Sequence, residues 1–222
     1  MTWVKICGIT NLEDALVAVE AGADAVGFAF YERSPRCVSV ETAREIVAKL
    51  PERVEKVGVF VNQHEDLICS IVDKAWITGV QMHGDKEDPH VADLIVERRP
   101  RFKILAAISM YHPNPQGWAM MWNPDSILAF LVDSGTSSKH GGTGKAFDWG
   151  ASVSVVSEIK SLAPVVVAGG LTADNVGEAM EVLHHPWGVD VSSGVEARPG
   201  KKDPEKVRAF VRAVRETDKK AG

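Results

Sequence analysis

One cysteine and one aspartate could act together as a base and an acid. Cys7 ends the apolar run TWVKIC, and Asp133 directly follows the apolar run ILAFLV. A thiolate can accept a proton and a carboxylic acid can donate one, so the two groups facing one cavity would form a base–acid pair. A free thiol with a pKa of about 8.5 is only slightly ionised at neutral pH, so a nearby positive charge would assist Cys7.

Two other uses of Cys7 stay open on the residues alone. The thiol could be inert and packed like a small hydrophobic group. It could also be a nucleophile activated by His83, which follows the run GVQM at 79–82. Cys7 and His83 end strand-like runs that lie three apart in chain order, so direct contact between them is the less favoured arrangement.

Glycine-rich turns follow the last two strand-like runs of the chain. They consist of Gly169, Gly170, Ser192, Ser193 and Gly194. Backbone N–H groups in such turns can bind a phosphate dianion without a lysine. Either turn alone could simply reverse the chain direction, but together on neighbouring strands they indicate a phosphorylated ligand.

Two basic residues have more than one interpretation. Arg36, in the loop 31–39, could bind a substrate carboxylate through two N–H groups or could be solvated, and spacing favours neither. Lys5 shares a strand face with Cys7, one layer below it. A buried ammonium needs a partner, and Asp190 is a candidate, so a structural ion pair is the favoured interpretation of these two residues.

Short β-branched runs and amphipathic stretches alternate along the chain. The runs that predict strands are 2–7, 25–30, 56–61, 79–82, 102–106, 127–132, 165–168 and 188–191. The stretches that predict helices are 12–21 after an Asn11 cap, 40–50, 66–75, 90–99, 151–162 with Asp148 as the cap, 172–183 and 204–216. Prolines and a glycine within 111–125 allow at most one or two helical turns, near 116–122.

This alternation predicts a parallel sheet, because a parallel return needs a crossover connection. Eight such units fit an α/β fold with a single closed (β/α)8 TIM barrel, one domain over residues 1–222. An open doubly wound sheet is the alternative, weakened because no GxGxxG follows the first strand. In a barrel the strands' C-terminal ends form one rim, so Cys7, His83, Asp133 and the glycine turns would share one cavity mouth.

The charge, hydropathy and cysteine content argue against several kinds of binding partner. The net charge is −5, which argues against a general nucleic-acid-binding face. No apolar run approaches the ~18 residues of a membrane helix, so no membrane partner is expected. Three scattered cysteines suit a reducing compartment, and we expect a cytoplasmic protein. No Cys/His quartet has zinc spacing, so no metal is expected.

Several motifs together resemble one known family, the phosphoribosylanthranilate isomerases of tryptophan biosynthesis. They are KICGIT (5–10), AGADAVGF (21–28), SPR (34–36), VGVFVN (57–62), QMHG (81–84), VDS (132–134), GGTGKAFDW (141–149), VAGGL (167–171) and GVDVSSGVEARPGKKDP (188–204). They span nearly the whole chain in family order. The chain departs from the family at QMHG, where QLHG is usual, and in the proline-rich segment 109–125.

The resemblance implies an intramolecular oxidoreductase that needs no metal and no organic cofactor. It would convert N-(5-phosphoribosyl)anthranilate to 1-(2-carboxyphenylamino)-1-deoxyribulose 5-phosphate by an Amadori rearrangement. Cys7 would be the general base and Asp133 the general acid, and Arg36 would contact the anthranilate carboxylate. The other implied substrate contacts are His83, with Gly142 and Gly144 in a loop over the site, and the two glycine turns would hold the phosphate. Family members occur as monomers and homodimers.

Rival functions come from barrels that bind similar ligands. Indole-glycerol-phosphate synthase uses a lysine as acid, and the aminoaldose isomerase of the histidine pathway uses paired aspartates. A barrel that carries a flavin phosphate without catalysis is a third alternative. The pair Cys7 and Asp133 favours the isomerase over the other two enzymes.

Overall fold

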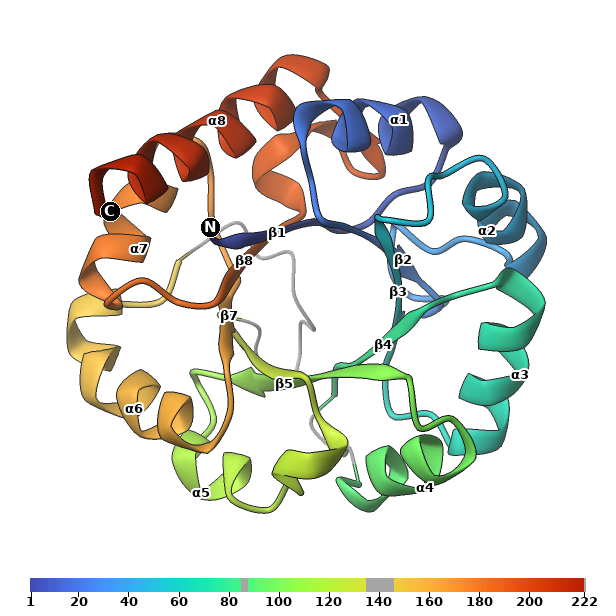
Figure 1. The fold of residues 1–222 in the computed structure, drawn as a ribbon, viewed down its shortest axis with the longest axis horizontal. Helices are drawn as coiled ribbons and strands as arrows, with labels where there is room; N and C mark the ends of the chain where they lie inside the picture. The colour runs from blue at the N-terminus through green and yellow to red at the C-terminus, as the bar shows by residue number, and fades with distance from the viewer. Residues whose placement is uncertain (85–87, 135–145, 222) are drawn as a thin grey trace.

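A closed barrel of parallel strands forms the centre of the protein. The structure is a computed structural model and describes residues 1–84, 88–134 and 146–221. The strands pair in chain order and β8 closes on β1, as Figure 1 shows in a view down the barrel. They are β1 (Trp3–Ile6), β2 (Ala25–Ala29), β3 (Glu55–Phe60), β4 (Gly79–Met82), β5 (Lys103–Ser109), β6 (Ala129–Asp133), β7 (Val165–Val167) and β8 (Gly188–Val191). The predicted (β/α)8 barrel is confirmed, and the open sheet is wrong.

Helices surround the barrel and connect its strands. They are α1 (Leu12–Ala21), α2 (Val40–Val47), α3 (Glu65–Ala75), α4 (His90–Arg98), α5 (Pro115–Ala119), α6 (Trp149–Leu162), α7 (Val176–Val182) and α8 (Pro204–Ala221). The predicted caps are present, because the side chains of Asn11 and Asp148 accept hydrogen bonds from the first turns of α1 and α6. The proline-rich segment forms the five-residue α5, within the one or two helical turns that its composition allows, and ends in a 3-10 turn at Pro124–Ser126.

Two features of the C-terminal region differ from the sequence-based expectation. Helix α8 was expected to end at residue 216, but it continues to Ala221. The added turn is held because the Asp218 carboxylate accepts hydrogen bonds from the Thr2 amide at 3.0 Å and the Thr2 hydroxyl at 2.6 Å. A small antiparallel ribbon of β9 (Glu196–Arg198) and β10 (Lys201–Lys202) was not predicted, since its strands are too short to show a pattern.

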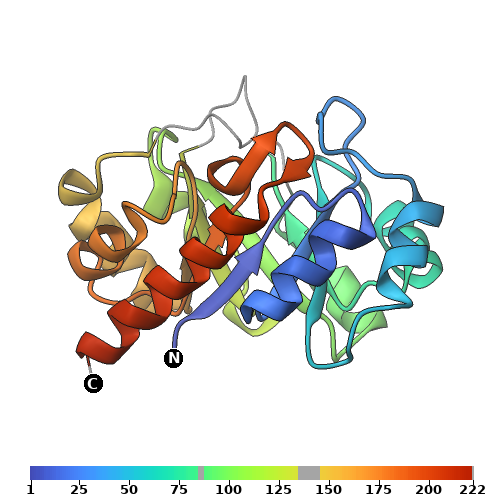
Figure 2. The same cartoon turned by 90° about the horizontal axis from the view of Figure 1, so that it is seen from above.

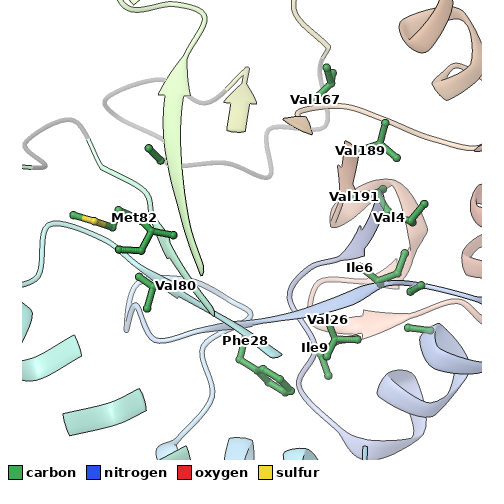
Figure 3. Close-up of a cluster of buried hydrophobic side chains, with 14 of the residues drawn as sticks. Val4, Ile6, Ile9, Val26, Phe28, Val80, Met82, Val167, Val189 and Val191 are labelled. Atoms are coloured by element: carbon green, nitrogen blue, oxygen red, sulfur yellow. The ribbon is translucent and has the colours of Figure 1, made fainter. Parts of the chain in front are cut away.

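Strand side chains alternate between two packing layers. One set, including Val4, Ile6, Val26 and Phe28, packs outward against the helices, and Figure 3 shows part of this buried cluster. The alternate set forms a smaller cluster rich in alanine and valine inside the barrel. Beyond this cluster, towards the C-terminal ends of the strands, the interior side chains include the polar Gln81 as well as apolar ones such as Val59.

The two ends of the barrel differ in what they carry. Figure 2 shows both chain termini at one end and the β9–β10 ribbon at the other. Because the strands are parallel, the ribbon lies at the end where the strands finish. Of the helices in the described part of the chain, none combines the length and the apolar character that crossing a bilayer requires.

Candidate active site

A cavity of about 770 Å³, part of it open to solvent, lies at the C-terminal ends of the strands. Cys7 and Asp133 both line it, as the alternation of side chains predicted. The other predicted site residues that line it are Arg36, His83, Gly169, Gly170, Ser192, Ser193 and Gly194. Gly142 and Gly144 lie outside the described residues. The predicted base, acid and phosphate turns therefore share one cavity.

The Cys7 thiol lies among charged groups of both signs. Burial raises the pKa of this thiol, and the Asp190 carboxylate adds to that increase. The ammonium groups of Lys5 and Lys202 act in the opposite direction, because positive charge favours the thiolate. The net pKa lies above the ordinary value. The positive charge expected near Cys7 is thus present, but its lowering of the thiol pKa is smaller than the increase that burial causes.

Lys5 is fully buried below Cys7 and has two oxygen partners. Its Nζ lies 2.9 Å from Oδ1 of Asp190 and 2.8 Å from Oε1 of Gln81. The predicted ion pair of Lys5 with Asp190 is therefore confirmed. Asp190 also lines the cavity, so the pair connects the barrel interior to the site. Burial lowers the pKa of Lys5, but the carboxylate and the thiol outweigh it and the net pKa is raised.

His83 faces the predicted acid instead of the predicted base. Its Nε2 lies 3.7 Å from Oδ2 of Asp133, and its Nδ1 lies 3.0 Å from Nε2 of Gln81. This arrangement argues against a nucleophilic pair of Cys7 with His83.

The Arg36 side chain is mostly buried and is paired with a carboxylate. Its Nε and Nη2 donate to the two carboxylate oxygens of Glu196, each at 2.8 Å, and its side chain is 14% exposed. The solvated alternative is therefore wrong, because Glu196 holds the guanidinium in place across the cavity rim. Lys202, also buried, lies 3.1 Å from Oε1 of Glu196 and donates to the Ser192 carbonyl at 3.0 Å.

These three charges form a cluster with one positive charge in excess. Burial would raise the pKa of Glu196, but hydrogen bonding from Arg36 and the charge of Lys202 hold it below its ordinary value. The carboxylate therefore stays ionised and cancels one of the two cations. The remaining charge favours an anionic group beside Arg36.

The two glycine turns pack directly on each other and on the predicted acid. Gly169 has φ +81°, and a Cβ there would overlap Oδ1 of Asp133. A Cβ on Gly194 would overlap the carbonyl oxygen of Leu171, so only glycine lets the second turn approach the first. Within the described residues, the backbone N–H groups of Gly169 and Gly170 donate to no backbone oxygen. Both remain able to bind an anion.

Sequence reasoning missed Glu196 and Lys202. Both fall in the stretch GVEARPGKKDP, whose family resemblance does not by itself indicate that it supplies charges to the site. Arg36 and Glu196 are 160 positions apart, so no spacing rule connects them. Within the described ranges, no group of three or more His, Cys, Asp or Glu side chains is placed to hold a metal ion.

The fold and the cavity define the protein as a (β/α)8-barrel enzyme, with its titratable groups at the C-terminal face where such enzymes carry their active sites. Residues 4–213 match the PRAI family, described as N-(5'-phosphoribosyl)anthranilate (PRA) isomerase. The chain belongs to this family. That membership favours the isomerase over the two related barrel enzymes and the flavin-phosphate carrier.

Individual relatives agree with this membership. The chain is 43% identical over 217 residues to the N-(5'-phosphoribosyl)anthranilate isomerase of Pelobacter propionicus, covering 98% of this chain and 97% of the relative. It is 45% identical over 212 residues to that of a Geobacter species, covering 95% and 97%. Both relatives have the same name, and the match covers almost the full length of each.

Solved structures show the same likeness in three dimensions. One is of monomers generated from the dimeric phosphoribosylanthranilate isomerase of Thermotoga maritima, with a TM-score of 0.82, 38% identity and coverage of 97% of this chain and 100% of that one. Another is a phosphoribosyl anthranilate isomerase in complex with reduced 1-(o-carboxyphenylamino)-1-deoxyribulose 5-phosphate, with a TM-score of 0.81, 36% identity and coverage of 97% and 100%.

Proposed function

We propose that the protein converts N-(5-phosphoribosyl)anthranilate to 1-(2-carboxyphenylamino)-1-deoxyribulose 5-phosphate, a step of tryptophan biosynthesis. The observation that carries the proposal is the placement of Cys7, Asp133 and the two glycine turns around one cavity. Family membership supports it, and so does the related structure with a reduced form of the product.

The acid step falls to Asp133 in this proposal. Its carboxyl proton passes to the ring oxygen of the furanose, the bond from C1 to that oxygen breaks, and the nitrogen lone pair forms the C1=N double bond of an iminium. Asp133 is left as a carboxylate. The nearby Nε2 of His83, at 3.7 Å from Oδ2, can stabilise that negative charge.

The base step falls to Cys7. The iminium acidifies the C2–H bond, and the Cys7 thiolate takes that proton while the bonding electrons form the C1=C2 double bond of an enolamine. The Cys7 thiol then gives a proton to C1 while the Asp133 carboxylate takes the enol O–H proton, which leaves the C2 ketone and restores the thiolate and the carboxylic acid. Atoms and charges balance without an oxidant, so the residues of the chain suffice.

Two groups of residues hold the substrate outside the reacting carbons. The turns Gly169–Gly170 and Ser192–Gly194 accept the phosphate, supported by the N–H groups of Gly169 and Gly170, which donate to no backbone oxygen within the described residues. Arg36 contacts the anthranilate carboxylate through Nη1 and the second N–H of Nη2, because Glu196 already holds its Nε and one N–H of Nη2. His83, Gly142 and Gly144 complete the proposed substrate contacts.

A spectroscopic assay with the phosphoribosylated aminobenzoate substrate tests the function. We expect turnover by the purified chain, unchanged when a metal chelator is added. A chain that binds the aminoaldose without converting it would contradict the proposal. A yellow preparation that carries a flavin phosphate and shows no turnover would favour the carrier function instead.

We further propose that residues 1–222 are one domain, because the barrel uses strands from Trp3 onwards and its last helix ends at Ala221. A cytoplasmic location and a monomeric or homodimeric state are also proposals. Size-exclusion chromatography with light scattering measures the mass of the protein in solution. A mass greater than that of two chains would contradict the monomeric or homodimeric state.

A further inference from the structure

A chain of polar contacts, the first two of them hydrogen bonds, crosses the barrel interior from the base side of the cavity to the acid side. Lys5 Nζ donates to Oε1 of Gln81, Nε2 of Gln81 meets Nδ1 of His83, and Nε2 of His83 faces Oδ2 of Asp133. The distances along it are 2.8, 3.0 and 3.7 Å. Gln81 is buried, so its amide has little freedom to rotate away.

The direction of this chain follows from what each group can donate. A lysine ammonium has donors only, so the Gln81 atom that faces Lys5 is the carbonyl oxygen. The Gln81 NH₂ group therefore faces His83, and it too can only donate. Nδ1 of His83 must then accept, so it carries no proton. The proton of a neutral His83 ring lies on Nε2, the nitrogen that faces Asp133.

We propose that Gln81 is a positioning residue that sets the tautomer of His83 and so points an N–H group at the Asp133 carboxyl group. The N–H dipole favours the carboxylate that forms when Asp133 gives up its proton. A separation of 3.7 Å is longer than a hydrogen bond, and such contacts often shorten when substrate closes a site. The tautomer assignment rests on the hydrogen bonds alone, whereas its effect on turnover rests on the proposed function.

The wild-type protein provides the first test. The full chain is prepared with ¹⁵N-labelled histidine, and long-range ¹H–¹⁵N correlation spectra report which ring nitrogen carries the proton. His83→Gln identifies the His83 signals, and the exposed His64 serves as an internal reference. We expect protonation of His83 at Nε2 only, at neutral pH. A proton on Nδ1, alone or together with Nε2, would overturn the inference whether or not the protein turns over substrate.

Gln81→Glu provides the second test. A carboxylate at this position can still accept from Lys5, but it also accepts from Nδ1, so His83 should gain a proton on Nδ1. We expect kcat to fall about tenfold with KM within about twofold, because the change acts through the acid step and not through binding. An unchanged His83 signal or an unchanged kcat would contradict the positioning role.

Two further variants keep the test clear. Ser157→Glu adds a negative charge at an exposed position of α6, outside the residues that line the cavity, and should leave the His83 signals and kcat unchanged. If Gln81→Glu does not fold, Gln81→Met keeps the length of the side chain and removes its donor. We then expect His83 to populate both tautomers, and an undisturbed Nε2–H tautomer would overturn the inference. Failure of the wild type to turn over the aminoaldose would overturn the proposed function alone.

Discussion

Gly27 on β2 leaves the space that the thiol of Cys7 occupies. A Cβ placed on Gly27 would lie 2.7 Å from Sγ of Cys7 and 3.1 Å from Cε of Lys5. Real Cβ atoms do not come as close as 2.7 Å to a non-bonded atom. Any residue larger than glycine at this position must therefore displace the thiol or the strand. The position of the proposed base is thus set by the absence of a side chain on the neighbouring strand.

We expect Gly27→Ala to lower turnover more than substrate binding. The added methyl group moves Sγ of Cys7 away from its place in the cavity, and overpacking of this kind costs about 1–3 kcal/mol of stability. The measurements are kcat, KM and the free energy of unfolding. Gly150→Ala on α6 is the control, because its Cβ would meet only an ordinary contact, 3.5 Å from Asp148 Oδ1. Full activity in Gly27→Ala would show that the base does not need this placement.

Cys7→Ser and Asp133→Asn should each lower kcat by at least about 10²-fold, the usual contribution of a general acid or base. Both replacements are close in size, so circular dichroism and thermal unfolding should show an intact barrel. Activity near that of the wild type in either variant would remove that residue from the mechanism.

The pH dependence of turnover should follow the Cys7 thiol. Burial raises the pKa of this thiol, and the base acts only when deprotonated, so kcat/KM should increase as the pH rises from neutral towards that pKa. Lys5→Met removes a charge that lowers the pKa of Cys7 and should move the rise to higher pH. A profile that is flat above neutral pH, or that moves to lower pH in Lys5→Met, would contradict this assignment.

Arg36→Ala should raise KM for the aminoaldose with a smaller effect on kcat, because the lost contact holds the carboxylate and not the reacting carbons. Steady-state kinetics measure both constants. Arg33→Ala is the matched control, since Arg33 is an exposed arginine in the same loop and should leave KM unchanged. An unchanged KM in Arg36→Ala would show that the carboxylate binds elsewhere.

Much of the site could be predicted from local pattern. A strand has a side-chain period of two, so the predicted strand ends place Cys7 above Lys5 and His83 above Gln81 on the interior face. Eight alternating units predict a closed barrel, and closure brings the strand ends to one rim. Cys7, His83, Asp133 and the glycine turns therefore lie together in the structure as expected.

The contacts between those residues depend on the tertiary structure. Arg36 finds Glu196 and not solvent because loop 31–39 and the β9–β10 ribbon meet over the barrel, 160 residues apart in the chain. His83 faces Asp133, and Gln81 reaches Lys5, because barrel closure and side-chain packing select one arrangement across the interior. The sequence by itself determined which side chains point inward, since that follows from the backbone period. Only the closed barrel decided which of them touch, since that depends on distances between strands far apart in the chain.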